Sequence, residues 1–154
     1  MRYFEDIVLG EVWELGERPV DQNEIMAFAL HYDPMPFHCE AAAEEESFFG
    51  SLTASSWHVN AMAMGLLTDN FKAQRLVSLG SPGINRCRWF VPVRPGDVLS
   101  GRSTVMAMRT STSRPMGLVT LRTEIFNQVR SKVAQMDGVS MYGCRPVKAI
   151  NDVS

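Results

Sequence analysis

The stretch that decides the fold is residues 56–71, which read SWHVNAMAMGLLTDNF. Its apolar side chains recur on every side of a helix, so we expect one long helix that is buried almost all round. Either Ser55 or Ser56 can cap it, because a serine hydroxyl accepts a hydrogen bond from the first free amides of a helix. A helix without a polar face has to be enclosed by a second layer of structure.

Strand patterns for that second layer begin after residue 73. Alternating or apolar runs occupy residues 85–93, 99–108, 118–127 and 133–141, with turns expected at residues 80–83 and 94–97. Strands joined by short polar connections predict an antiparallel sheet. No repeat or linker divides residues 1–154. We therefore expect a single α+β domain, an antiparallel sheet around a long central helix, with the strand order left open.

Shorter helices are expected before the long one. Residues 23–30, NEIMAFAL, have helical spacing, and Asp21 with Glu24 makes a capping box at their start. A second short helix is expected over residues 40–46. The stretch between them, residues 31–40, reads HYDPMPFHCE. Pro34 and Pro36 exclude a helix there and favour extended conformations at the residues before them.

This proline-braced loop carries the best acid–base pair in the chain, Asp33 and His38. A rigid loop can aim both side chains into one cleft. Histidine titrates near neutrality, and a carboxylate can orient it or share a water molecule with it. Taken alone, an Asp and a His on a loop are more often surface residues, so the pair needs support from other parts of the chain.

Three segments resemble one family, the MaoC-like dehydratases, also called the hydratase-2 family. Residues 32–40, YDPMPFHCE, resemble its signature of an Asp, any residue, an amide residue, Pro, an apolar residue, His, any residue and an acid. Residues 55–58, SSWH, are similar to the start of the family's central helix. Residues 88–97, RWFVPVRPGD, are similar to its strand and Pro-Gly-Asp turn. The segments occur in family order, and the likeness covers about residues 20–130.

The resemblance implies a hot-dog fold and a hydro-lyase. Members add water to trans-2-enoyl thioesters to form 3-hydroxyacyl thioesters, usually of the R configuration, or run the reverse. The family's catalytic pair falls on Asp33 and His38, which bind and activate the water. The backbone N–H of Ser56 would stabilise the enolate charge on the thioester oxygen. No metal or separate cofactor is implied, since coenzyme A is part of the substrate.

Candidate substrate-binding residues surround these positions. An arginine can donate two parallel hydrogen bonds to one phosphate group. Arg88, with Arg86 and Arg94, is therefore a candidate for binding the phosphates of coenzyme A. His58 can instead be a hydrogen-bonded core residue. The full set of substrate-binding candidates is Met35, Phe37, Ser55, Trp57, His58 and Arg88.

Two positions depart from the family pattern and keep other functions open. Met35 replaces the amide residue, and Ser56 replaces the usual glycine at the helix start. A thioesterase of the same fold, which needs one acidic residue near the central helix, is one alternative. A non-catalytic subunit that binds an acyl thioester is another. The residues do not reveal the acyl chain length, or whether a coenzyme A or a carrier-protein thioester is used.

Composition and charge limit the partners. The net charge of −2 gives no reason to expect nucleic acid or an anionic membrane as a partner. No run of about 18 apolar residues suits a membrane span, and the N-terminus does not read as a secretory signal. Three scattered cysteines suggest reduced thiols in a cytoplasmic protein. Because a lone hot-dog sheet has exposed edges, we expect a homodimer or a dimer-based higher oligomer.

Overall fold

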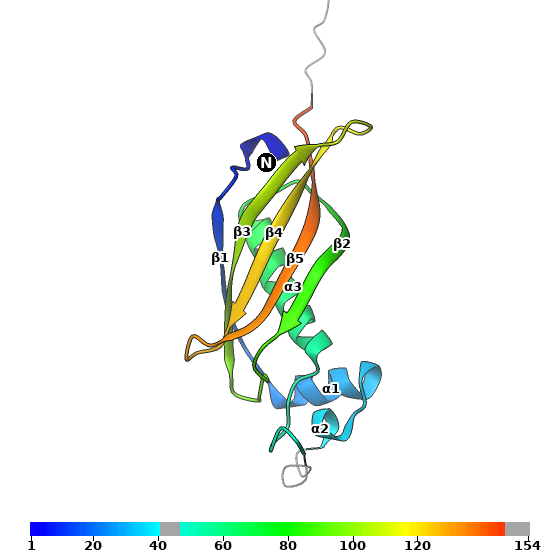
Figure 1. Ribbon diagram of the computed structural model, residues 1–154, viewed down its shortest axis with the longest axis vertical. Coiled ribbons are helices and arrows are strands. Elements are labelled where there is room, and N and C mark those ends of the chain that lie inside the picture. The colour runs from blue at the N-terminus through cyan, green and yellow to red at the C-terminus, as the bar shows by residue number, and fades with distance from the viewer. Residues whose placement is uncertain (41–46, 147–154) are drawn as a thin grey trace, which may run out of the picture.

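A five-stranded antiparallel sheet curls around one long helix, α3 (Ser56–Ala73), in the computed structural model, which describes residues 1–40 and 47–146 (Figure 1). The strand order is β1-β3-β4-β5-β2. The strands are β1 (Val12–Pro19), β2 (Ser78–Trp89), β3 (Val98–Thr110), β4 (Met116–Phe126) and β5 (Lys132–Gly143). The expected α+β hot-dog arrangement is confirmed.

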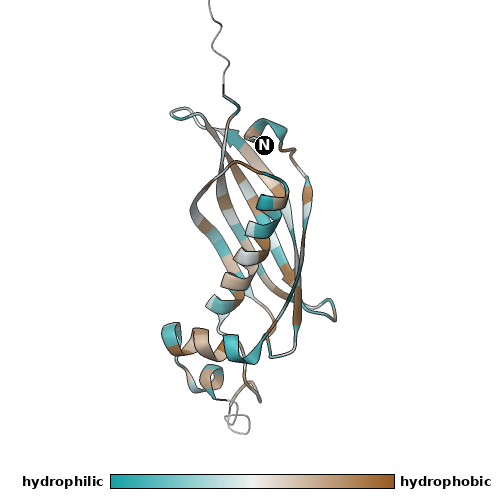
Figure 2. Ribbon diagram, turned by 180° about the vertical axis from the view of Figure 1, so that it is seen from behind, coloured by the Kyte–Doolittle hydropathy of each residue, from teal (hydrophilic) through white to brown (hydrophobic). Residues whose placement is uncertain are grey.

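Helix α3 starts where the serines predict. Ser55 is its N-cap, and the Ser55 hydroxyl accepts a hydrogen bond from the backbone N–H of Trp57 at 3.3 Å. The prediction of burial almost all round is wrong. One face is buried in the core, whereas Trp57, Ala61 and Met64 on the other side are exposed. Figure 2 shows the cause, since the curled sheet lies behind α3 and covers one side of it.

The core fills the space between α3 and the concave face of the sheet. Helix positions three and four residues apart supply one wall, and alternating strand residues supply the other. These side chains include Met62, Ala63, Leu66, Val105, Val119, Leu121, Ile125, Ala134 and Tyr142.

Strand β1 was not among the predicted strands. The side chains of Trp13 and Leu15, two residues apart, are both buried in the core, and this spacing is typical of a strand, although it covers only a few residues. The pattern then breaks at Gly16, whose φ is 56°, because the register with β3 shifts between Glu14 and Glu17. Such a bulge interrupts the period of two by which a strand is recognised.

Strand β2 begins earlier than expected, and the predicted turn at residues 80–83 is wrong. Gly80 and Pro82 lie inside this strand, which pairs with β5 through several register shifts. The other edge of β2 has no partner strand among the described residues. Proline and glycine are tolerated there because an edge strand needs only one set of ladder hydrogen bonds.

The short helices α1 (Gln22–Tyr32) and α2 (Pro36–Cys39) lie together at the N-terminal end of α3 (Figure 1). Asp21 caps α1 as predicted, accepting from the N–H of Glu24 at 2.9 Å. The exclusion of a helix after the prolines is wrong, because Pro36 is the first residue of α2, where a missing N–H costs nothing. The predicted helix over residues 40–46 falls almost entirely outside the described residues.

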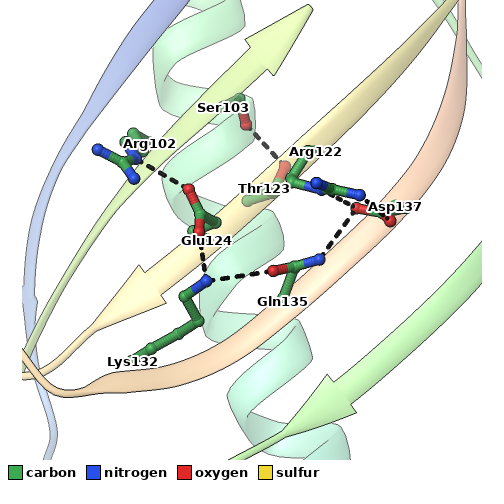
Figure 3. A network of polar contacts seen from close by, with 8 residues as sticks. All are labelled: Arg102, Ser103, Arg122, Thr123, Glu124, Lys132, Gln135 and Asp137. Carbon is green, nitrogen blue, oxygen red and sulfur yellow. Dashed lines mark hydrogen bonds and ion pairs between the residues drawn. The ribbon is translucent and has the colours of Figure 1, made fainter. Parts of the chain in front are cut away.

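Paired charges cover the convex face of the sheet, turned away from α3 (Figure 3). Glu124 of β4 binds Arg102 of β3 at 2.9 Å and Lys132 of β5 at 2.5 Å. Arg122 donates two hydrogen bonds to Asp137, at 2.8 and 2.9 Å. These contacts join neighbouring strands and leave this face polar. Among the described helices, none is long and apolar enough to span a membrane.

Candidate active site

Asp33 is held at the point where α1 ends and α3 begins. Its backbone N–H donates to the carbonyl of Ala29 at 2.9 Å and so closes α1. Its carboxylate accepts a hydrogen bond from the Ser55 hydroxyl at 2.7 Å. Since Ser55 is the N-cap of α3, the carboxylate lies beside the N-terminus of that helix. The positive end of the helix dipole favours an anion at this place.

His38 projects from α2, and its ring is almost buried, with 8% of the residue exposed. The Nδ1 atom lies 2.6 Å from the backbone carbonyl oxygen of Thr53. A carbonyl can only accept, so Nδ1 carries the proton and donates it. In the neutral ring the other nitrogen, Nε2, is therefore an acceptor. The backbone at Thr53 thus selects the tautomer of His38.

The acceptor nitrogen of His38 faces the carboxylate of Asp33. The distance from Nε2 to Oδ2 is 3.5 Å, longer than an ordinary hydrogen bond. An unprotonated Nε2 and an ionised carboxylate are both acceptors, so neither can donate to the other. A water molecule can donate one hydrogen to each of them. The pair is therefore arranged to bind and polarise a water.

A cavity of about 330 Å³ is lined by His38 of this pair, whereas Asp33 is not among its lining residues. His38 and Phe37 form one side of it, and Ser56 and Val59 of α3 form another. A further wall comes from Trp89, the last residue of β2, and from residues 90–93, which follow that strand. Ser56 is the first residue of α3, and the first amides of a helix have no acceptor within the helix. A carbonyl oxygen placed in this cavity could accept from such an amide.

Other predicted residues lie near the pair in supporting positions. Ser55 is completely buried and contacts Asp33, so it acts on the carboxylate. Met35 is 47% exposed, and its side chain does not line the cavity. Its backbone contributes instead, since its N–H donates to the Asp33 carbonyl at 2.8 Å and its carbonyl accepts from the His38 N–H at 2.9 Å. Met35 thus shapes the loop through its main chain.

The structure does not bring three of the predicted residues into the cavity. Trp57 is 62% exposed and packs edge-on against Trp89, with ring centres 5.8 Å apart. Arg88 is exposed and pairs across strands with Gln135, so it lies on the polar convex face. Arg94 donates to the carbonyl of Phe49 at 2.7 Å and so links the Phe49 backbone to the turn at residues 94–97.

His58 also points away from the cavity, toward α1. It is 2% exposed, and its ring stacks on Phe28 with centres 4.7 Å apart. Its Nε2 lies 3.6 Å from Glu24, and its buried Nδ1 has no hydrogen-bond partner among the described residues. Burial lowers the pKa of His58, although Glu24 acts in the opposite direction. The alternative of a core residue fits this environment better than contact with a substrate.

Some residues of the site escaped prediction. Thr53 acts through its carbonyl oxygen, which any residue could supply, so no sequence signal points to it. Phe49, Phe90 and Val91 line the cavity because separate segments meet there. Across residues 1–40 and 47–146, no group of three or more His, Cys, Asp or Glu side chains could hold a metal ion.

Comparisons with known proteins agree with this geometry. Residues 8–125 match the family model described as MaoC like domain. Protein MaoC of Klebsiella aerogenes is 30% identical over 104 residues, which are 67% of this chain and 30% of that protein. The chain thus spans less than a third of this curated relative.

Solved structures extend the likeness to the whole fold. The MaoC-like dehydratase from Rhodospirillum rubrum is 32% identical, with a TM-score of 0.81 over 94% of this chain and 99% of that one. An (R)-hydratase from A. caviae involved in PHA biosynthesis is 22% identical, with a TM-score of 0.67 over 92% of this chain and 99% of that one. At that identity the second likeness shows the fold alone.

Proposed function

Because the chain belongs to the MaoC-like dehydratase family, we propose that it is a hydro-lyase that reversibly adds water to a trans-2-enoyl thioester. The product is a 3-hydroxyacyl thioester. One observation carries this proposal: the tautomer imposed on His38 by Thr53 leaves two acceptors, Nε2 and the Asp33 carboxylate, 3.5 Å apart. A water that lies to one side of the pair and donates to both acceptors would have its oxygen free to attack.

In the hydration direction, the water oxygen bonds to the β-carbon while one water proton passes to Nε2 of His38. Asp33 stays ionised and stabilises the imidazolium that forms. The electron pair of the carbon–carbon double bond moves toward the thioester carbonyl. The resulting enolate then takes the proton at its α-carbon, which leaves His38 neutral again. One molecule of water has been added, and no other reactant is consumed.

The thioester oxygen gains negative charge in this step, and the start of α3 is suited to stabilise it. We assign this role to the backbone N–H of Ser56, which borders the cavity. A free amide at a helix N-terminus combines a hydrogen bond with the positive end of the helix dipole. The serine hydroxyl is not needed for this role.

The finer features of the function are part of the same proposal. Coenzyme A is the expected carrier and the R configuration the expected product, as the sequence resemblance to the hydratase-2 family implies. A homodimer is supported by β2, almost all of whose residues are exposed and whose outer edge lacks a partner strand in the described part of the chain. Pairing two such edges would satisfy their backbone groups.

Crotonyl-CoA tests the proposal directly. Purified protein should consume the enoyl absorbance without releasing free thiol, and a stereospecific dehydrogenase should detect (R)-3-hydroxybutyryl-CoA. Asp33→Asn and His38→Ala should each lower kcat by about 100-fold or more. His31→Ala is the matched control, because His31 is exposed and its Nδ1 bonds within α1, to the carbonyl of Ala27. Thiol release without hydration would instead identify a thioesterase, and tight binding without turnover a non-catalytic subunit.

A further inference from the structure

Helix α1 lies at the N-terminal end of α3, and two of its pairwise contacts with α3 bear on the candidate site (Figure 1). At the C-terminal end of α1, the Asp33 carboxylate accepts from the Ser55 hydroxyl. About one and a half turns earlier, the ring of Phe28 stacks on the ring of His58, with centres 4.7 Å apart. His58 follows Ser55 on α3 by about one turn. The acid of the candidate pair thus ends a helix that rests on two side chains of α3.

A carboxylate in the first turn of α1 adds to the stacked contact. Nε2 of His58 lies 3.6 Å from Glu24, which accepts a hydrogen bond from Nη2 of Arg18 of β1 at 2.6 Å. The Nδ1 atom of His58 is buried and has no hydrogen-bond partner among the described residues. A neutral ring with its proton on Nε2 suits this place, because that proton faces the carboxylate and Nδ1 has no proton to donate. His58 therefore contacts α1 with both its face and its edge.

The cluster of Arg18, Glu24 and His58 is packed onto α3 but stays outside the cavity. A Cβ at Gly65 of α3 would lie 3.4 Å from Nη1 of Arg18, so the guanidinium passes directly over the helix. The side chain of His58 is only 3% exposed, whereas that of Glu24 is 41% exposed. Among the described residues, those that line the 330 Å³ cavity include none from α1. The cluster can thus act on α1 without changing the walls of the cavity.

We propose that His58 is a positioning residue for Asp33: by holding α1 against α3, it keeps the Asp33 carboxylate beside Nε2 of His38. This inference rests on the proposed hydration of enoyl thioesters. The distance of 3.5 Å between the two groups depends on where α1 ends, and a small displacement of a reacting group is costly. Because α1 does not line the cavity, a displaced α1 should impair turnover and leave substrate binding intact.

The test is His58→Leu, which keeps a buried apolar side chain but removes both contacts with α1. With crotonyl-CoA, kcat should fall at least about fivefold while KM stays within about twofold of the wild type. Leu66→Val is the matched control, since Leu66 is a core residue about two turns further along α3 that does not line the cavity. It should change neither constant. An equal loss of kcat in both variants would overturn the inference.

A double-mutant cycle with Asp33→Asn separates positioning from a general loss of structure. If His58 acts through Asp33, adding His58→Leu to Asp33→Asn should change kcat by less than about twofold, because the carboxylate whose position matters is already gone. A merely structural role predicts the same loss of at least about fivefold in both backgrounds. That result would contradict the proposal.

Two milder variants separate the two contacts. His58→Phe keeps a ring against Phe28 but loses the contact with Glu24, whereas His58→Gln keeps an N–H donor for Glu24 but loses the stack. Each should retain more kcat than His58→Leu, with KM unchanged. Equal kcat values in all three variants would contradict the role of these contacts. Should His58→Leu not fold, Phe28→Leu removes the stack at a half-buried position and should lower kcat by a smaller factor, and an unchanged kcat would contradict the inference.

The outcomes separate this inference from the function on which it rests. If the wild type hydrates no enoyl-CoA, the proposed function fails and the positioning role fails with it. If the wild type is active and a folded His58→Leu variant keeps the wild-type kcat, only the positioning role is wrong.

Discussion

The Ser55 hydroxyl donates a hydrogen bond to the Asp33 carboxylate at 2.7 Å while it caps the helix on which it stands. One side chain thus connects the start of α3 to the acid of the candidate pair. The orientation of the carboxylate depends on a capping residue that lies on a different element. A change at Ser55 should accordingly affect both stability and activity.

Ser55→Ala should lower the free energy of unfolding by about 1 kcal/mol, the usual cost of losing an N-cap. It should also lower kcat about tenfold or more, since misplacing a reacting group by a small distance is costly. Asp21→Ala removes the cap of α1 and is the matched control, expected to lose similar stability but little kcat. Denaturant unfolding and crotonyl-CoA kinetics measure the two effects. If Ser55→Ala lowered kcat no more than Asp21→Ala does, the hydrogen bond from Ser55 to Asp33 would have no role in turnover.

Met35→Asn should have little effect, although it restores the family's amide. Met35 supports the loop through its backbone, and its half-exposed side chain touches neither member of the pair by a hydrogen bond. An exposed substitution of this kind usually changes stability by less than about 0.5 kcal/mol. The kcat for crotonyl-CoA should stay within about threefold of the wild type. A much larger change in either direction would give the Met35 side chain a direct role.

The pH dependence of stability should report on His58. Burial lowers the pKa of His58, so the folded protein binds its proton less readily than the unfolded chain. Stability from this residue is therefore full above the unfolded pKa and is lost as the pH falls through and below that value. His58→Gln should reduce the loss of unfolding free energy between pH 7 and pH 5, whereas His31→Gln, on an exposed residue, should not. Parallel curves for all three proteins would contradict this reading.

The convex face offers an electrostatic test. Arg122 lowers the pKa of Asp137 through two hydrogen bonds and its charge, so folding favours the ionised carboxylate. This stability is present above the unfolded pKa of Asp137 and disappears as the pH falls through its folded pKa. Asp137→Asn should cost about 1 kcal/mol at neutral pH, within the range for such pairs, and less in acid. Urea unfolding across the acidic range measures this difference.

Asp69→Asn is the control for that measurement, because it removes one exposed negative charge from α3 without touching the cross-strand pairs. Its effect on unfolding free energy should be small at every pH. If the two variants behave alike, the contribution at Asp137 comes from net charge, and the bidentate pair with Arg122 adds nothing of its own.

Several elements followed from the residues alone. The cap at Ser55, the helical run after it, the turn at residues 94–97 and three of the later strands depend on neighbours in the chain, so their signals are local. The same holds for Asp33 and His38 as the candidate acid–base pair, because their spacing and the prolines around them can be read directly from residues 32–40. Their chemical role remains a prediction to be tested by Asp33→Asn and His38→Ala.

Tertiary structure decided how those parts act together. The Thr53 carbonyl that selects the His38 tautomer and the Ser55 hydroxyl that holds Asp33 reach the pair across 15 and 22 positions of the chain. Strand β2 tolerates Pro82 because only one of its edges is paired with a strand of the described residues, and α3 stays open on one side because the sheet curls around the other. Local periodicity encodes which residues form an element, but contacts between distant segments set the orientation, tautomer and exposure on which chemistry depends.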